Sequence, residues 1–180
     1  MTIAVIYGGT RKNGNTELLT EEAIKGKPAE RIHLTDYKIE PIVDQRHAES
    51  GFAEVNDDYN QIIDRILPHE ILLFSTPIYW YSMSGTMKLF VDRWSQILRD
   101  PNYPDFREKM SSKKAYVIAV GGDLPYLKGL PLIQQFQYIF DFMGISFEGY
   151  IIGEGNRPGE ILNDKAAFFK ASELNKTLRG

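Results

Sequence analysis

Short runs of β-branched and aromatic residues alternate along the chain with segments whose apolar residues recur at helical spacing. The strand-like runs are continuously apolar, which is typical of parallel strands covered on both faces. Five strands are predicted, at residues 3–7, 31–34, 71–74, 115–120 and 146–152. Five helices are predicted to follow them in turn, at residues 15–24, 57–67, 84–98, 130–143 and 161–178. This alternation predicts an α/β fold with a mostly parallel sheet.

The clearest helical pattern is that of residues 84–98, where Trp94 lies on the apolar face and is expected in the core. Gly144 stands where the fourth predicted helix needs a C-terminal cap. Residues 35–56 and 99–114 are predicted as long loops, and their role is left open.

Length and composition favour a single-domain protein and give no support for a nucleic-acid-binding, membrane or metal-binding class. The chain has 180 residues without an internal repeat or linker, so residues 1–180 are predicted to form a single domain. A net charge of -3 gives no reason to expect a nucleic-acid partner or a membrane surface. No signal peptide and no apolar stretch of the ~18 residues that span a bilayer is seen, so a cytoplasmic protein is expected. The chain has no cysteine, and His33, His47 and His69 lack zinc-like spacing, so no metal site is predicted.

The first predicted strand runs directly into Gly8-Gly9-Thr10-Arg11-Lys12-Asn13-Gly14-Asn15-Thr16, and a helix follows. Such a turn suits an anion, because free backbone N–H groups and the helix dipole favour negative charge. Thr10, Asn13, Asn15 and Thr16 can add neutral hydrogen bonds. The sequence therefore predicts a phosphate-binding loop.

Three phosphate-binding patterns compete for this loop. The dinucleotide fingerprint fails, because Thr10 and Asn13 stand where its second and third glycines belong. The triphosphate loop has its spacing in Gly9 and Gly14, but Asn15 replaces the lysine that neutralises the β and γ phosphates. A single terminal phosphate, as in FMN, fits best. A capped turn that binds nothing is the alternative.

The third predicted strand ends in a loop with three consecutive aromatic residues, Tyr79, Trp80 and Tyr81. Ligands of open α/β sheets bind beyond the carboxyl ends of the strands. Aromatic walls at this edge suit an isoalloxazine ring, and packing in the core or at a subunit interface is the alternative. After the fourth strand, Gly121 and Gly122 either let the backbone approach such a ring closely or form a plain tight turn.

The loop at residues 8–16 resembles the phosphate loop of the NADPH-dependent FMN reductases. Thr76-Pro77-Ile78-Tyr79-Trp80, with Ser84-Gly85-Thr86-Met87-Lys88 and Asp92-Arg93 after it, resembles their flavin-ring loop and the next helix. The order and separation of these motifs, with Gly121-Gly122, extend the resemblance over most of the chain. The resemblance implies a flavodoxin-like three-layer sandwich, in which a five-stranded parallel sheet of order 2-1-3-4-5 has helices on both faces. It also implies FMN as cofactor and a homodimer or homotetramer.

The resemblance assigns residues to both ends of the FMN. Those expected at the phosphate are Thr10, Arg11, Asn13, Asn15 and Thr16. Those expected at the isoalloxazine are Pro77, Ile78, Tyr79 and Trp80, with Gly121 and Gly122 nearby. Gly9 departs from the family, which often has serine there, so Thr10 is expected to supply that hydroxyl. The related iron–sulfur flavoproteins carry a cluster of cysteines after the second strand, and the matching residues 41–47 have none.

The expected function is an FMN-dependent oxidoreductase that takes hydride from NADPH or NADH. Its expected acceptor is a small molecule: a quinone, an azo or nitro aromatic, a free flavin or a ferric chelate. No catalytic side chain is predicted, because the flavin carries the chemistry. Two alternatives are a flavodoxin-type electron carrier, which strong acidity would favour and the net charge of -3 does not, and a regulatory binding module without catalysis.

Overall fold

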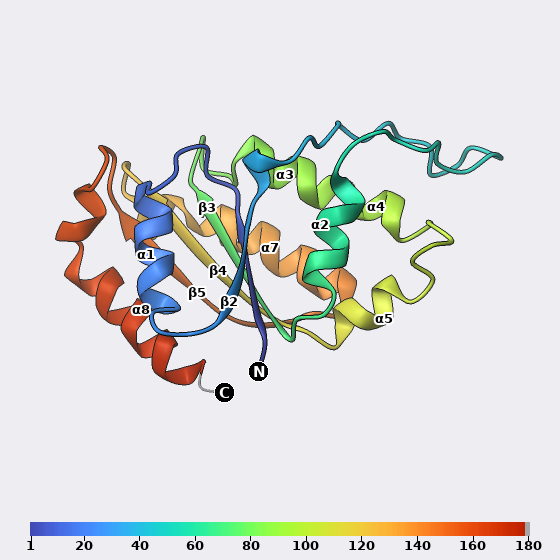
Figure 1. The fold of residues 1–180 in the computed structure, drawn as a ribbon. Helices are drawn as coiled ribbons and strands as arrows, with labels where there is room; N and C mark the ends of the chain where they lie inside the picture. Colours follow the sequence, from blue (N-terminus) through green and yellow to red (C-terminus); the bar gives the residue numbers. More distant parts are fainter. Residues whose placement is uncertain (179–180) are drawn as a thin grey trace.

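The computed structural model describes residues 1–178 and has a five-stranded parallel sheet at its centre (Figure 1). The strands are β1 (Ile3–Tyr7), β2 (Ala29–His33), β3 (Ile71–Pro77), β4 (Lys114–Gly121) and β5 (Ser146–Glu154). Their order in the sheet is β2-β1-β3-β4-β5, and every neighbouring pair is parallel. The predicted flavodoxin-like architecture is confirmed.

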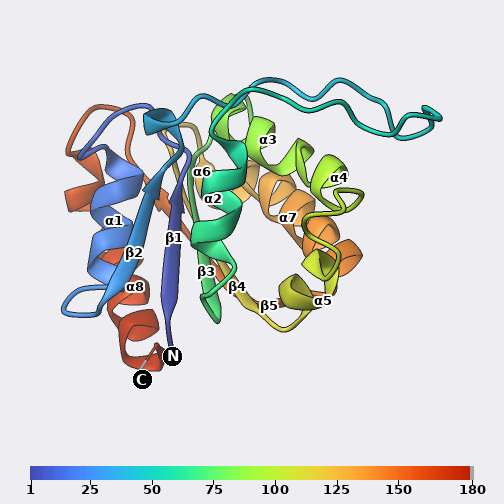
Figure 2. The same cartoon turned by 45° about the vertical axis from the view of Figure 1, so that its right-hand side comes forward.

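Helices cover both faces of this sheet (Figures 1 and 2). The α-helices are α1 (Asn15–Ala23), α2 (Tyr59–Ile66), α3 (Gly85–Asp92), α4 (Trp94–Ile97), α5 (Phe106–Ser111), α6 (Pro125–Lys128), α7 (Leu130–Met143) and α8 (Lys165–Thr177). Two 3-10 helices, η1 (Leu34–Asp36) and η2 (Glu160–Asn163), precede longer elements. One face carries α1 and α8, and the other carries α2, α3 and α7.

The alternation of side chains along each strand divides the apolar residues between two cores. In β1, Ala4 and Ile6 lie in the larger core, which contains the apolar faces of α2, α3 and α7. Ile3, Val5 and Tyr7 lie in the smaller core under α1 and α8. Since both faces are covered, every position of β1 is buried, and this explains the continuous apolar run in the sequence.

Most predicted elements are present, and three differ. The predicted helix at 84–98 divides at Arg93 into α3 and α4. The predicted loop at 99–114 contains α5, which buries Phe106 and Met110 four residues apart on one face. The predicted helix at 161–178 begins as η2 and restarts as α8, where the Asp164 carboxylate accepts the Ala167 N–H at 3.0 Å. Gly144 caps α7 with φ 75°, as predicted.

The segment after η1 forms an arm, residues 38–57, which runs out from the body of the protein in both ribbon views (Figures 1 and 2). Its base is held by Arg93, which is only 1% exposed. The Arg93 guanidinium donates to Asp57 Oδ2 at 2.6 Å and to the Glu40 carbonyl at 2.9 Å. It also lies over the Tyr59 ring, 4.6 Å from the centroid. This buried ion pair ties the junction of α3 and α4 to the base of the arm.

The sheet topology places the site. From β1 the chain passes through α1 to β2 on one side, and from β3 it passes through α3, α4 and α5 to β4 on the other side. Connections that depart in opposite directions leave a crevice at the carboxyl ends of the two strands. The loops that follow β1, β3 and β4 all begin at this edge.

We expect Asp57→Ala to lower the free energy of unfolding by about 3–5 kcal/mol, because it leaves the buried Arg93 guanidinium without its carboxylate. Asp92→Ala is the matched control. It removes the exposed Lys88–Asp92 pair and is expected to cost less than about 0.5 kcal/mol. Urea unfolding of both variants measures the difference. Equal losses would show that the buried pair does not stabilise the fold.

Candidate functional site

A cavity of about 650 Å³ opens at the carboxyl edge of the sheet. Its walls come from the β1–α1 loop, the ends of β3 and β4, and residues Gly155, Asn156 and Pro158 of the β5–η2 loop. Every residue predicted to contact a ligand lines this cavity, with the exception of Trp80. Trp80 lines an adjoining cavity of about 260 Å³, which shares Ile78, Gly121, Gly122 and Asn156 with the first. The structure thus brings the two predicted motifs to one place.

The β1–α1 loop presents an uncapped helix end to the cavity. Gly14 is the N-cap of α1 and offers no side chain to the first-turn N–H groups of the helix. Asn13 has φ 58°, and its N–H donates to Glu17 Oε2 at 2.6 Å, which fixes the loop in this left-handed conformation. In the described part of the chain, the exposed guanidinium of Arg11 has no hydrogen-bond or ion-pair partner. Uncapped N–H groups and a free cation make this end suited to an anion.

The Asn15 side chain is predicted to contact the phosphate, but both of its polar groups bond to the β5–η2 loop. Its side-chain Oδ1 accepts the Gly159 N–H at 2.8 Å, and its Nδ2 donates to the Arg157 carbonyl at 2.9 Å. The amide therefore joins the β1–α1 loop to the β5–η2 loop, two segments more than 140 residues apart. Asn15 lines the cavity and at the same time fixes its width.

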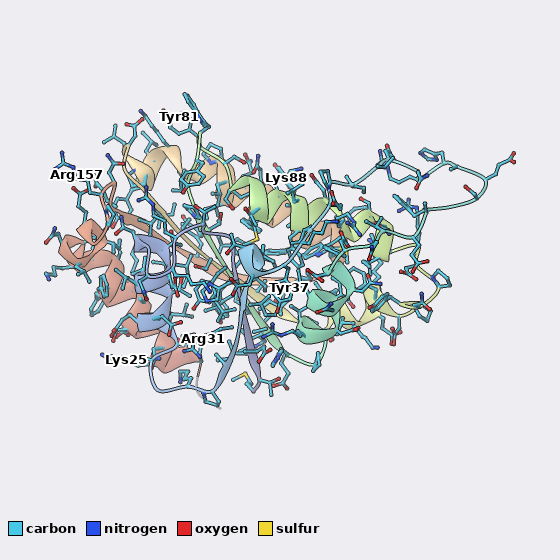
Figure 3. All side chains as sticks on the ribbon, turned by 45° about the horizontal axis from the view of Figure 1, so that its top comes forward. Lys25, Arg31, Tyr37, Tyr81, Lys88 and Arg157 are labelled. Atoms are coloured by element: carbon cyan, nitrogen blue, oxygen red, sulfur yellow. The ribbon has the colours of Figure 1, made fainter. Side chains whose placement is uncertain are left out.

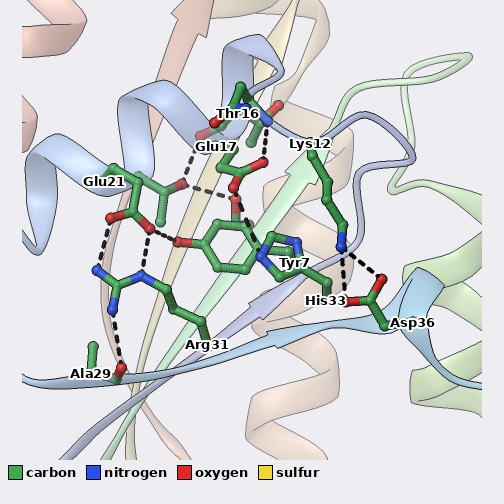
Figure 4. Close-up of polar contacts among 12 residues, drawn as sticks. Tyr7, Lys12, Thr16, Glu17, Glu21, Ala29, Arg31, His33 and Asp36 are labelled. Carbon is green, nitrogen blue, oxygen red and sulfur yellow. Dashed lines mark hydrogen bonds and ion pairs between the residues drawn. The ribbon is translucent and has the colours of Figure 1, made fainter.

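The floor of the anion-binding end is a polar network that the sequence did not reveal (Figure 4). The Tyr7 hydroxyl donates to Glu21 Oε1 at 2.5 Å, and the Arg31 guanidinium donates to both oxygens of Glu21. The two Arg31 hydrogen bonds lower the pKa of Glu21. Burial, reinforced by the bond to Glu21, raises the pKa of Tyr7 far above its ordinary value. Tyr7 is therefore the member of this network that lines the cavity, as a protonated phenol, and the Glu21 carboxylate that it contacts is neutralised by Arg31.

His33 forms the wall next to this floor. Its ring stacks on Tyr7 with centroids 4.5 Å apart and planes 11° from parallel, and its Nε2 lies 3.8 Å from Glu17 Oε1. His33 lacks metal-like spacing to the other histidines, so its sequence pattern does not mark it as a site residue. The signal that could have found it is its place at the end of the second strand, beside the end of the first.

The other end of the cavity is apolar and carries a tight turn. Pro77, Ile78 and Tyr79 line it. The backbones of Tyr79 and Ser82 exchange two hydrogen bonds of 3.0 Å, and the two residues between them, Trp80 and Tyr81, have φ 48° and 65°. Such left-handed conformations cost about 1–3 kcal/mol each for residues other than glycine. Trp80 is 94% exposed, and Figure 3 shows Tyr81 reaching out from the same edge.

Gly121 and Gly122 allow the loops after β3 and β5 to pack closely against the end of β4. A Cβ on Gly121 would lie 3.1 Å from the Ile78 side chain, and one on Gly122 would lie 2.6 Å from Asn156. Any larger residue would push apart the walls of the cavity. The pair of glycines is thus explained by the packing of the β3, β4 and β5 loops around the cavity.

Two further observations limit the kinds of site present. Across residues 1–178, no helix is long and apolar enough to cross a membrane. Within the same range, no group of three or more His, Asp or Glu residues is arranged to hold a metal ion.

The sheet order and the cavity at its switch point define a flavodoxin-like protein. The family model of the NADPH-dependent FMN reductases matches residues 1–129, and the chain belongs to this family. It is 64% identical over 176 residues to YwqN of Bacillus subtilis (strain 168), named as a candidate NAD(P)H-dependent FMN-containing oxidoreductase, with 98% of this chain and 97% of YwqN covered.

Two other relatives extend the comparison. The solved structure of the Trp repressor binding protein from Bacillus subtilis superposes with a TM-score of 0.83 at 57% identity, covering 96% of this chain and 97% of that one. An iron–sulfur flavoprotein of Methanocaldococcus jannaschii is 25% identical over 190 residues, covering 98% of this chain and 94% of that protein. The predicted relation to iron–sulfur flavoproteins is confirmed, although this chain has no cysteine.

The low pKa of Glu21 predicts a pH dependence of stability. A carboxyl whose pKa is lower in the folded chain stabilises the fold above its unfolded value, about 4.3, and loses that contribution as the pH falls through the folded value. We therefore expect the free energy of unfolding of the wild type to fall more steeply from about pH 5 to 3 than that of Glu21→Gln. Glu173→Gln, which alters the exposed pair with Lys176, is the control. Parallel curves for wild type and Glu21→Gln would contradict this role.

Proposed function

We propose that residues 1–180 work as one FMN-containing, NAD(P)H-dependent oxidoreductase domain that passes electrons to a small acceptor. The observation that carries the proposal is the cavity of about 650 Å³ at the switch point of the sheet, with an anion-binding end and an apolar end. This volume is within the ordinary range for cofactor sites. Membership of the family and the name of the 64% identical YwqN support the same cofactor and co-substrate.

The residues at the anion-binding end fit the FMN phosphate. Thr10, Asn13 and Thr16 line the cavity beside the uncapped start of α1, and Arg11 supplies a positive charge. Glu21 does not oppose a dianion here, because Arg31 already neutralises it. Asn15 acts by holding the β1–α1 loop against the β5–η2 loop.

The apolar end fits the isoalloxazine. Pro77 and Ile78 offer apolar surface, and Gly121 and Gly122 let the loop after β4 pack closely on Ile78 and Asn156 at the same end. Tyr79 lines this end, and Trp80 stands at its outer edge, on the adjoining cavity. When bound, FMN supplies the redox chemistry, taking hydride from NADPH or NADH and passing electrons on. The protein orients the ring and leaves one side of it open to the second reactant.

The acceptor belongs to the class of small redox-active molecules, such as quinones, azo or nitro aromatics, free flavins and ferric chelates. We further propose a homodimer or homotetramer, since the Tyr79–Ser82 turn exposes aromatic surface at the mouth of the cavity.

A second candidate function is binding to a regulatory protein without catalysis. It is favoured by the name of the 57% identical Trp repressor binding protein. Oxidation of NADH or NADPH that requires both FMN and an added quinone would separate the two, because a binding module has no reason to support turnover.

The phosphate end predicts a difference between FMN and riboflavin. We expect the wild type to bind FMN more tightly than riboflavin. The variant Thr16→Ala should weaken FMN far more than riboflavin, because only FMN places a phosphate at the start of α1. Isothermal titration of both flavins measures this, and riboflavin is the internal control for general damage. Equal weakening of the two flavins would place the phosphate elsewhere.

A further inference from the structure

The Tyr79–Ser82 turn has a backbone conformation that its own residues disfavour. Two-residue turns with two left-handed positions are normally built from Asn-Gly or similar pairs. Here the two positions are the aromatic residues Trp80 and Tyr81. A strained turn of this kind persists only where its surroundings hold it. The contacts that hold it should therefore be visible in the structure.

Two sets of side-chain contacts hold it: the Ser82 hydroxyl donates to Gln135 Oε1 of α7 at 2.9 Å, and Tyr81 joins a cluster with Asp123 and Lys128. The Tyr81 hydroxyl donates to Asp123 Oδ2 at 2.9 Å, and Lys128 Nζ donates to the same oxygen at 2.6 Å. The Lys128 ammonium also lies over the Tyr81 ring, 5.6 Å from its centroid. Each group of this cluster thus contacts both of the others. The two donors lower the pKa of Asp123, so that the carboxylate stays charged at neutral pH.

The cluster joins the two walls of the apolar end. Ile78 and Tyr79 belong to the loop after β3, whereas Gly121 and Gly122 belong to the loop after β4. The last ladder bond between these walls is that of the Ile78 N–H to the Val120 carbonyl, at 2.8 Å. Beyond it, within residues 1–178, the bond from Tyr81 to Asp123 is the side-chain hydrogen bond that crosses from one loop to the other.

The cluster stands beside the large cavity and not in it. Tyr81, Asp123 and Lys128 line the adjoining cavity of about 260 Å³ and are absent from the walls of the larger one. They are also half exposed, which makes their bonds individually weak and able to open. Their effect on a ring in the large cavity must therefore be indirect.

We propose that Tyr81, Asp123 and Lys128 form a latch that holds the strained Tyr79–Ser82 turn and so positions the wall of the cavity against the isoalloxazine ring. The three are positioning residues, and the inference rests on the proposed function, because it takes the apolar end as the ring site. The latch acts on the ring and not on the phosphate. Opening it should weaken FMN and riboflavin by the same factor, in contrast to changes at the start of α1.

The test compares Tyr81→Phe with a control of the same chemistry elsewhere. Tyr126 donates its hydroxyl to Asp164 at 2.5 Å, and Lys170 lies over its ring at 5.7 Å, so Tyr126→Phe removes an equivalent bond outside the turn. We expect Tyr81→Phe to raise the Kd of both flavins by about three- to tenfold, the range for one ordinary intramolecular hydrogen bond, because this bond is half exposed. Tyr126→Phe should leave both Kd values unchanged.

Two further measurements test whether Tyr81 and Asp123 act together and whether their bond restrains the turn. Asp123→Ala and Tyr81→Phe should not add in the double variant, because both break the same bond. In the flavin-free protein, Tyr81→Phe should lower the fluorescence anisotropy of exposed Trp80, while Trp94, which is 3% exposed, gives a constant background.

The outcomes separate the latch from the proposed function. A wild type that binds neither flavin overturns both. A wild type that binds both flavins, with Tyr81→Phe matching Tyr126→Phe in affinity and anisotropy, overturns the latch alone. Additive losses in the double variant, or a loss confined to FMN, also overturn it.

Discussion

The parallel pairing of β1 with both β2 and β3 is the constraint on which the rest of the site depends. The register aligns Tyr7, the last residue of β1, with His33 on one side and Ser75 on the other. β1 and β2 therefore end at one level, β3 continues to Pro77, and their loops leave from the same edge of the sheet. Because the connections from β1 and from β3 depart in opposite directions, the crevice between them is not filled by a helix. The cavity and its two unlike ends follow from this register.

Electrostatics then distinguish the two ends. At the start of α1, the backbone N–H groups and Arg11 are open to a ligand, and Arg31 neutralises Glu21 nearby. The Glu17 carboxylate, which also lines the cavity, accepts the Asn13 N–H and lies 3.8 Å from His33 Nε2. The uncapped helix end and Arg11 thus provide the attraction for an anion, although the chain as a whole carries a charge of -3. The opposite end relies on apolar surface and on a turn held under strain. A ligand with a phosphate at one end and a flat ring at the other matches this polarity.

Local pattern was sufficient for the strands, for α7 and its Gly144 cap, and for both motifs, because each depends on residues close together in the chain. Local pattern was insufficient where contacts between residues far apart in the chain determine the structure or the role of a side chain. The buried ion pair at the junction of α3 and α4 joins Arg93 to Asp57, 36 residues apart. The role of Asn15 depends on Arg157 and Gly159, and the floor of the cavity on Tyr7 and Glu21 meeting across the β1–α1 loop. The short helix α5 was missed because only two buried residues mark it in a polar segment.

Anaerobic reduction of the FMN-loaded protein would show whether FMN in this cavity is the redox centre for NAD(P)H. NADH or NADPH would be added in slight excess without any acceptor, while the flavin absorbance near the visible maximum is followed. We expect the bound flavin to bleach, and its colour to return when a quinone is added. A protein that binds FMN but keeps its colour with both nicotinamides would not be an FMN-dependent NAD(P)H oxidoreductase.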